Sequence, residues 1–382
     1  MADDRTDAGA DTATRVFLDH RELLFAIAYN MLGTVTDSED VLQETWLSWA
    51  GRTARAEVRG GGAGGAGAEG AGAPADPADG EGAVTGGGAV AGAGGTGGEG
   101  PAAGAGLPAG AGGGRAAGAA PVIEHPRAYL VRIAVRHALA RRESIARRRE
   151  TYVGPWLPEP LVTGGTAGDP DAADEAVRQE SVSLALLVVL ETLTPLERAV
   201  FVLHEVFGYA HTEIADMLGR SPAAVRQLAH RARGHVRARR PRYRAHPRVR
   251  RQVTERFLDA TIGGDLGALM EILAPDATLW TDGGGKAPAA PRPIRGRDKV
   301  ARALTGFAAR SAEGLELRHR DVNGDASVVV FADGAPHAVM VMDLDPDREQ
   351  VRDVYLVTNP DKLSTAGGRA EERAPGRPAR GV

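Results

Sequence analysis

The chain has 382 residues, a formal net charge of −4 and no cysteine. The length predicts two or three domains, and 43% hydrophobic residues suffice for buried cores. The lack of cysteine excludes disulfides, zinc ribbons and thiol chemistry. No apolar run approaches the roughly 20 residues that span a bilayer, and the start Met1–Asp4 is unlike a signal peptide. We therefore expect a cytoplasmic protein with no membrane partner.

Two amphipathic helices are predicted near the N-terminal end. After an expected disordered tail over residues 1–13, the spacing of apolar residues predicts a helix from Thr14 to Leu32. The capping-box pattern Thr36–Glu39 predicts the start of a second helix, which places Trp46 and Trp49 in the core.

A glycine- and alanine-rich segment interrupts this pattern from Gly60 to Ala120. It contains 26 of the 51 glycines of the chain. Glycine costs a helix about 1 kcal/mol per residue relative to alanine, and few large apolar side chains are present to offset the ordering entropy. The segment is therefore predicted to be disordered.

A basic block follows from His125 to Tyr152, with eight arginines and two acids. A helix is predicted here, and spacings of three and four place Tyr129, Arg132 and Arg136 on one face. An aromatic ring among arginines suits single-stranded DNA, because bases stack on the ring while the cations follow the phosphates. Half-buried packing is an equally good interpretation of Tyr129.

The most informative segment is a predicted helix-turn-helix between Thr194 and Arg240. The capping box Thr194–Glu197 begins one helix, His211–Leu218 forms the next, and a third begins at Ser221. A preceding helix over Asp174–Leu193 connects this segment to the rest of the chain.

The third of these helices is predicted to recognise DNA. Its apolar residues face the partner helices, so hydrogen-bond donors and cations remain outside, where base edges and phosphates would lie. The chain carries 12 arginines and no acid from Arg220 to Arg251, which is typical of a nucleic-acid-binding surface. A solvated helix face is the alternative interpretation. The predicted contact residues are Ser221, Ala224, Arg226, Gln227, His230, Arg231 and Arg233.

The pattern changes to mixed helices and strands after Pro247. Helices are predicted at Thr254–Ile262, Leu266–Ala274 and Asp298–Arg310. Strands are predicted at Ala277–Thr281, Leu315–Val322, Ser327–Phe331, His337–Leu344 and Gln350–Thr358. These elements predict an α+β domain with a curved antiparallel sheet.

Three segments resemble modules of the sigma-70 family. Asp37–Trp46 is similar to the segment that docks on the polymerase clamp, His125–Ala134 to the helix that melts and contacts the −10 promoter element, and Thr194–Arg240 to the domain that contacts the −35 element. No further domain separates these modules, as in the extracytoplasmic-function (ECF) sigma factors. The resemblance implies −10 contacts by the basic helix and polymerase contacts by Asp40, Gln43 and Glu44, which would otherwise be read as an exposed polar face.

Three short strings are similar to those of the SigJ-like subgroup, which carries a SnoaL-like domain behind the sigma modules. They are Trp156–Pro160, Asp282–Lys286 and Asn359–Leu363. The implied fold is two all-α sigma modules, the second a helix-turn-helix, followed by an α+β SnoaL-like cone-shaped domain. The implied partners are promoter DNA and core RNA polymerase, through the clamp of its largest subunit and its flap. The resemblance implies no cofactor, no catalysis and no separate anti-sigma factor.

These observations predict the domain boundaries. Sigma domain 2 covers 14–152 and is interrupted by the insert over 60–120. A linker over 153–173 leads to sigma domain 4 over 174–245. The SnoaL-like domain covers 248–363, and a second disordered tail covers 364–382.

The three strings are predicted to form a regulatory interface through which the SnoaL-like domain acts on the sigma modules in cis. Short rigid strings with tryptophan, proline and single charges suit docking better than catalysis. Lys286 and Lys362 are expected to pair with an acid such as Glu159, while apolar contacts supply most of the stability. The predicted interface residues are Trp156, Leu157, Pro158, Asp282, Gly284, Lys286, Asn359, Asp361 and Lys362.

Two other functions fit parts of the sequence. SnoaL-like folds include enzymes with a cone-shaped pocket, which Trp280, Asp282, His319 and His337 would line, but no nucleophile–base spacing or metal-ligand set is visible. A repressor or activator that binds DNA without polymerase would explain the helix-turn-helix but would leave the other two sigma-like segments without a role.

Overall fold

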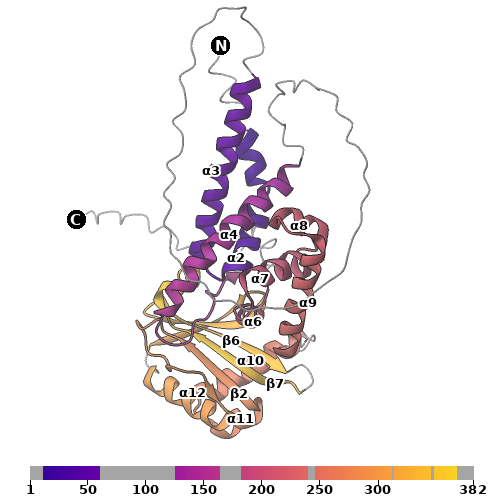
Figure 1. Ribbon diagram of the computed structural model, residues 1–382. Helices are drawn as coiled ribbons and strands as arrows, with labels where there is room; N and C mark the ends of the chain where they lie inside the picture. Colours follow the sequence, from indigo (N-terminus) through magenta and orange to yellow (C-terminus); the bar gives the residue numbers. More distant parts are fainter. Residues whose placement is uncertain are drawn as a thin grey trace, which may run out of the picture. The chain divides into compact units, whose positions relative to one another are not determined.

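The computed structural model describes residues 12–60, 125–163, 182–239, 246–311, 314–345 and 348–367 (Figure 1). The predicted disordered insert lies outside the described residues, apart from Gly60 at the end of a helix. The predicted fold class is confirmed: helical modules precede an α+β domain.

The first helical module consists of α2 (Arg21–Leu32), α3 (Val35–Gly60) and α4 (Pro126–Glu150). The helix predicted over Thr14–Leu32 is interrupted, because residues 12–18 form a separate helix and a turn precedes α2. The predicted N-terminal tail therefore ends slightly too late.

The start of α3 was also predicted one residue too late. The helix begins at Val35, and the hydroxyl of Thr34 donates a hydrogen bond of 2.6 Å to the Asp37 carboxylate. Gly33 allows the sharp turn between α2 and α3, since its φ of 79° lies in the left-handed region. Trp49 is buried, as predicted, and its indole N–H donates to the Ala13 carbonyl at 2.9 Å.

The second helical module consists of α6 (Leu184–Leu190), α7 (Pro195–Phe201), a π-helical turn η1 (Val202–Val206), α8 (His211–Leu218) and α9 (Pro222–Arg239). The predicted capping box of α7 is confirmed in both directions, with Glu197 N donating to Thr194 Oγ1 at 3.3 Å and Thr194 N to the Glu197 carboxylate at 3.2 Å. The described part of the helix predicted over Asp174–Leu193 begins only at α6.

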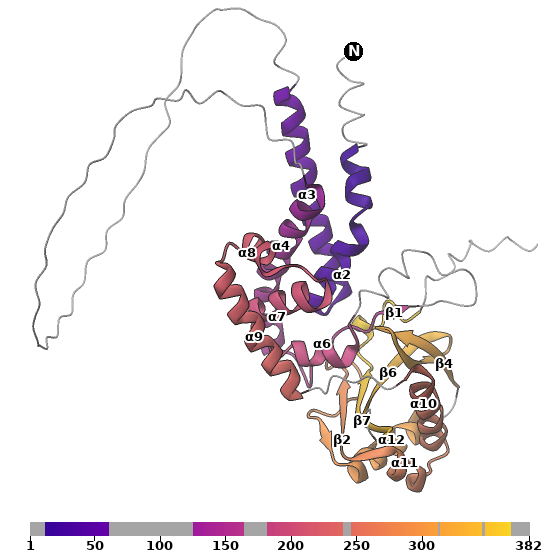
Figure 2. The ribbon, with the colours of Figure 1, turned by 90° about the vertical axis from the view of Figure 1, so that its right-hand side faces the viewer.

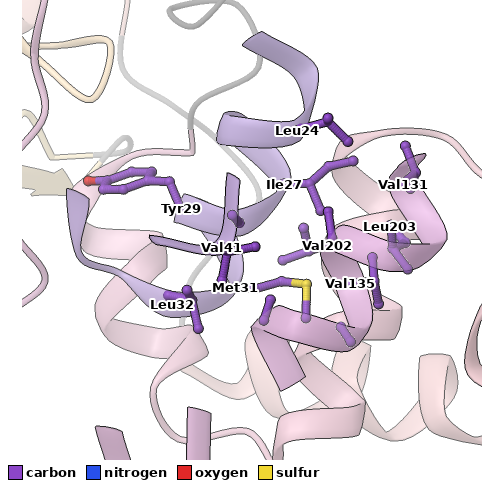
Figure 3. Close-up of a cluster of buried hydrophobic side chains, with 14 of the residues drawn as sticks. Leu24, Ile27, Tyr29, Met31, Leu32, Val41, Val131, Val135, Val202 and Leu203 are labelled. Atoms are coloured by element: carbon purple, nitrogen blue, oxygen red, sulfur yellow. The ribbon is translucent and has the colours of Figure 1, made fainter. Parts of the chain in front are cut away.

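The two helical modules share one hydrophobic core. Leu24 and Ile27 of α2, Val131 of α4, and Val202 and Leu203 of η1 belong to a single buried cluster (Figure 3). α4 also packs directly against α7 and α8. Burying a side chain of this size stabilises a protein by about 1.5–3 kcal/mol, so the shared core holds the two modules together.

A cluster of buried charges lies beside this core. The carboxylate of Glu191, just after α6, accepts hydrogen bonds from Arg142 (3.3 Å), Arg198 (2.5 Å) and Arg149. Arg198 has no solvent exposure and also donates to the carbonyl of Asn30 at the end of α2, at 2.9 Å. Burial alone would raise the pKa of Glu191, but the three arginines lower it to about 2.

The C-terminal domain is a seven-stranded sheet with three helices. The helices are α10 (Pro247–Ile262), α11 (Leu266–Ile272) and α12 (Arg297–Ser311). The strands are β1 (Val162–Thr163), β2 (Leu273–Asp282), β3 (Ile294–Arg295), β4 (Leu315–Val322), β5 (Asp325–Ala332), β6 (Ala335–Asp345) and β7 (Gln350–Val357), in the order β1-β4-β5-β6-β7-β2-β3. All predicted strands are present, but the prediction of an antiparallel sheet was wrong at one position, because β2 pairs in parallel with β7.

The two faces of the sheet are covered by different parts of the chain (Figure 2). The helices α10, α11 and α12 cover one face, where Phe257 and Val300 pack against Val354. The other face packs against Leu157 and against Leu184 of α6. Strand β1, which belongs to the predicted linker, adds to the edge of β4. The linker and the second helical module are therefore part of the packing of the C-terminal domain.

Replacing Glu191 by Gln tests the buried charge cluster. We expect the free energy of unfolding at pH 7 to fall by about 3–5 kcal/mol, because three arginines lose their charged partner. The pKa of Glu191 is lower in the folded chain than its ordinary value of 4.5, so its contribution is complete above pH 4.5 and declines as the pH falls toward 2. Denaturant unfolding of both proteins between pH 7 and 3 measures this difference.

Glu143→Gln, at an exposed position of α4, is the control and should change stability by less than about 0.5 kcal/mol. If wild type and Glu191→Gln lose stability in parallel as the pH falls, Glu191 does not carry the proposed charge interaction.

Candidate functional site

The recognition helix α9 presents a row of polar side chains to solvent. Val225 and Ala229 are buried against the other helices of the module, while Arg226, Gln227 and His230 are exposed. Ser221 caps the helix, because its hydroxyl accepts a hydrogen bond from Ala224 N at 3.2 Å, and Ala224 itself is half-buried. Of the predicted DNA-contacting residues, Ser221 and Ala224 therefore position the first turn, and the exposed three form its outer surface.

Two further predicted contacts are already held by acids of the preceding helices. Glu197 pairs with Arg231 Nε at 3.0 Å, and Glu205 pairs with Arg233 Nε at 3.2 Å. Burial would raise the pKa of Glu197, but hydrogen bonds from Thr194 and the charge of Arg231 lower it. Sequence reasoning missed both acids, although Glu197 was visible as part of the capping box.

The start of α8 is capped from within the helix. Ala210 cannot accept a capping hydrogen bond, and the carboxylate of Glu213 instead accepts one from Ala210 N at 2.7 Å. Glu213 therefore supplies half of a capping box from within the helix.

The basic helix α4 exposes Arg132 and Arg136 on its surface. Tyr129 is half-buried, with its ring centroid 6.0 Å from that of Trp49 and 5.1 Å from the guanidinium carbon of Arg52. Tyr129 thus packs partly against the hydrophobic core, as in the packing interpretation. Its contact with a DNA base remains a prediction.

The predicted polymerase-binding residues lie on α3 opposite the arginines of α4. Gln43 is exposed, whereas Asp40 and Glu44 are half-buried and both pair with Arg141, Glu44 at 3.3 Å. Asp37 joins them at 3.1 Å from Arg141 Nε. Sequence reasoning did not identify Arg141, because the pairing spans the insert.

The three predicted interface strings meet around the buried carboxylate of Asp282. This side chain has no exposure and accepts hydrogen bonds from Leu157 N (2.8 Å), Lys362 Nζ (2.8 Å) and the hydroxyl of Tyr152. Lys362 also donates to the Leu157 carbonyl at 2.6 Å. One residue from each string thus closes a small ring of hydrogen bonds around the linker backbone.

The Trp156 indole contacts two cations. Lys362 Nζ is 3.4 Å from the ring centroid and the guanidinium carbon of Arg149 is 4.5 Å from it. Tyr152 meets the same ring edge to face at 4.7 Å. Burial lowers the pKa of Lys362 to about 8, and the Asp282 carboxylate opposes this shift. Desolvated cation–π contacts contribute about 2 kcal/mol.

Asn359 and Gly284 complete this site. The Asn359 amide donates to the Tyr152 hydroxyl at 2.8 Å and lies directly over Gly284, where an added Cβ would approach Asn359 Cγ to 2.6 Å. Gly284 also has a φ of 59°. Glycine at this position therefore lets the second string pass beneath the third.

The expected lysine–Glu159 pairs were wrong. Lys362 pairs with Asp282, and Lys286 pairs with Asp361 at 2.6 Å on the surface. Glu159 is buried and accepts hydrogen bonds from Val35 N (2.8 Å) and Ser364 Oγ (3.0 Å). Burial raises the pKa of Glu159, and the hydrogen bonds from Val35 and Ser364 oppose this shift.

Further contacts extend along the linker. Pro158 is buried, the Glu159 carbonyl accepts a hydrogen bond from the Tyr29 hydroxyl at 2.7 Å, and Asn323 donates to the same hydroxyl at 2.7 Å. Thr365 donates to the Pro160 carbonyl at 2.8 Å. The predicted start of the C-terminal tail at Ser364 is therefore too early, because Ser364 and Thr365 both bind the linker.

The residues of the alternative enzyme pocket do not come together. Trp280 donates to Asp353 at 3.1 Å and packs on the linker face of the sheet, and Asp282 is engaged as described. His337 is exposed. Only His319 of the four lines a cavity of about 230 Å³, with Arg251 and Thr254 of α10 among its neighbours.

The described residues contain no cluster suited to a metal ion and no membrane-spanning helix. In the described ranges, no three His, Asp or Glu side chains are arranged to hold a metal ion. None of the helices seen in the structure combines the length and the apolar character needed to cross a bilayer.

Replacing Gly284 by Ala tests the packing under Asn359. We expect a loss of unfolding free energy of about 2–4 kcal/mol, because the added methyl group combines left-handed strain with a clash. Gly264→Ala is the matched control, since its φ is 68° but no atom lies within 4 Å of the added Cβ. It should cost only about 1–2 kcal/mol. Equal losses in denaturant unfolding would show that Asn359 does not constrain Gly284.

Comparisons with known proteins all find similarity to bacterial sigma factors. The family model "Sigma-70, region 4" matches residues 183–236. The ECF RNA polymerase sigma factor SigJ of Mycobacterium tuberculosis is 35% identical over 296 residues, which cover 77% of this chain and 73% of that protein. A probable ECF RNA polymerase sigma factor SigI of the same organism is 30% identical over 64% of this chain and 81% of its own length.

A solved structure extends the similarity to the whole fold. The crystal structure of M. tuberculosis SigJ superposes with a TM-score of 0.57 at 29% identity, and covers 90% of this chain and 96% of that chain. The similarity therefore includes the C-terminal α+β domain as well as the helical modules.

Proposed function

Because this chain belongs to the ECF RNA polymerase sigma factors, we propose that it is a self-restrained sigma factor whose SnoaL-like domain holds the DNA-binding modules closed. As a member of this family it is an alternative sigma factor that directs transcription initiation, and the family is not enzymatic. The finer proposal concerns how activity is regulated in cis.

One observation carries the proposal: the buried Asp282–Lys362 pair of the C-terminal domain grips the linker backbone at Leu157 from both sides. The linker connects the two helical modules, so the grip acts on the segment that would have to move if they separated. Release of the linker would leave Asp282 and Lys362 each without one hydrogen-bond partner, and a buried polar group left unpaired costs about 1–3 kcal/mol, so the grip restrains the linker.

The length of a promoter explains why separation is needed. Elements named for positions −10 and −35 are roughly 25 base pairs apart, which is roughly 85 Å of duplex. In the described conformation α4 packs against α8 of the helix-turn-helix. Two helices in contact cannot occupy both elements, and the closed form therefore represents an inactive state in this proposal.

The DNA and polymerase contacts are proposed residue by residue. Arg226 and Gln227 would contact base edges of the −35 element, since arginine and glutamine can bind guanine and adenine through paired hydrogen bonds. Arg132 and Arg136 would follow the −10 strand. Gln43, with Asp40 and Glu44, would contact the polymerase clamp. Co-purification with core polymerase distinguishes this function from that of a polymerase-independent repressor.

Run-off transcription with purified core RNA polymerase tests the function. A promoter-dependent transcript is expected from the full chain or from a variant with a weakened linker grip. If neither gives a specific transcript, and neither co-purifies with core enzyme, the proposed function is wrong.

Base readout and phosphate contact on α9 are separable by substitution. Arg226→Ala should weaken binding to −35 DNA by about 1–3 kcal/mol and relax the base preference at one position. Arg237→Ala, at an exposed position near the end of the helix, should weaken binding evenly across sequences and lower the salt slope by about one. Titrations of labelled duplexes at several salt concentrations measure both, and identical behaviour of the two variants would contradict the assignment.

Trp156→Ala should loosen the closed form. The substitution removes the ring between Lys362 and Arg149, so we expect a larger radius of gyration in small-angle scattering and more promoter-specific transcript. Val153→Ala is the control, since Val153 lies on the same linker with 64% exposure and should leave both readouts unchanged. Scattering and transcription that match wild type in Trp156→Ala would remove the proposed restraint.

A further inference from the structure

Four buried N–H donors belong to three residues where the linker meets the two helical modules, and these residues are connected by direct contact or through Glu191. The donors are Arg149 Nε and Nη2, Arg198 Nη2 and Trp156 Nε1, and they have no hydrogen-bond partner among the residues that the structure describes. A buried donor without an acceptor costs about 1–3 kcal/mol, and more for a charged group. Three of these donors belong to positively charged arginines, so the acceptor that suits them best is an anion.

The donors belong to one continuous cluster. Arg149 and Arg198 both bind the carboxylate of Glu191, and Arg149 stacks on the ring of Trp156. Arg198 Nη2 lies 3.5 Å from the position of a Cβ at Gly33, and the Pro158 side chain lies at the same distance. The donors therefore come from α4, from α7 and from the linker at a single junction.

The charges at this junction do not balance. Arg142, Arg149 and Arg198 share the single carboxylate of Glu191, which leaves two guanidinium charges in excess. Repulsion within the cluster is visible in Arg142, whose pKa falls to about 10 through burial and through the charge of Arg198. Uncompensated buried charge is strongly unfavourable, and the carbonyls at the end of α2 offset only part of it.

We propose that this junction binds one small anion of the halide class, such as chloride, between Arg149, Arg198 and Trp156. A monatomic anion accepts several N–H donors and brings no hydrogen atom that would need an acceptor. Gly33 packs closely against Arg198, Glu191 and Pro158, which favours a small ion over a larger oxyanion. The ion bridges both helical modules and the linker, so it stabilises their closed arrangement whether or not the C-terminal domain regulates transcription.

Thermal unfolding of the full chain tests the site in solution. With sodium chloride in place of sodium gluconate at equal ionic strength, we expect a saturable rise in Tm of roughly 2–4 °C. Trp156→Phe keeps the stacked ring but deletes one donor, and should reduce the chloride-dependent rise to less than half. Trp280→Phe is the control, since its indole N–H already binds Asp353, and it should keep the full rise.

Crystals grown with sodium bromide locate the ion. An anomalous peak within hydrogen-bond distance of Arg149, Arg198 and Trp156 supports the proposal. Equal Tm values in chloride and gluconate, a chloride effect unchanged in Trp156→Phe, or a peak only at other positions would each overturn it, and would show that water satisfies these donors. None of these readouts depends on transcription, so failure here leaves the proposed restraint open to its own tests.

Discussion

The arrangement of this chain depends on one buried carboxylate. Asp282 lies at the end of β2 with no solvent exposure, and its two oxygens bind Lys362, the backbone N–H of Leu157 and the hydroxyl of Tyr152. A charge at this depth is tolerated only while its partners stay in place. If the linker left, Asp282 would lose the donors of Leu157 and Tyr152 and would have to be resolvated.

A second buried acid, Glu191, holds positively charged partners within the helical modules in the same way. Glu191 binds Arg142, Arg149 and Arg198, and Arg149 stacks on Trp156, whose ring also contacts Lys362. The two acids are thus joined by an unbroken series of cation, ring and carboxylate contacts. Loss of the linker grip would uncover Trp156 and weaken the hold on Arg149. The shared hydrophobic core would then be the main interaction that keeps the modules together.

Local signals in the sequence predicted the elements well, and long-range pairings were missed. The capping box at Thr194 and the strand Leu315–Val322 depend on neighbours within a few residues, and both are confirmed. The parallel pairing of β2 with β7 joins strands about 80 residues apart in the chain, which no local pattern reveals. The three interface strings were found by resemblance, but their pairing was not, because the contacts of Glu159 with Val35 and Ser364 and of Lys362 with Asp282 join residues far apart in the chain. Glu191 was not singled out at all, since its partners lie on helices separated from it by the linker or by a capping turn.

The central claim is that the two DNA-binding modules are closed in the free chain and separate on core RNA polymerase. The chain has no cysteine, so cysteines introduced at Ser144 of α4 and Ala238 of α9, both exposed, can be labelled specifically with nitroxide spin labels. Pulsed electron–electron double resonance then measures the distance between the two labels. We expect a single short distance in the free protein, a longer one with core polymerase, and a mixture of the two in Trp156→Ala. The same distance with and without polymerase, in a sample that initiates transcription, would contradict it.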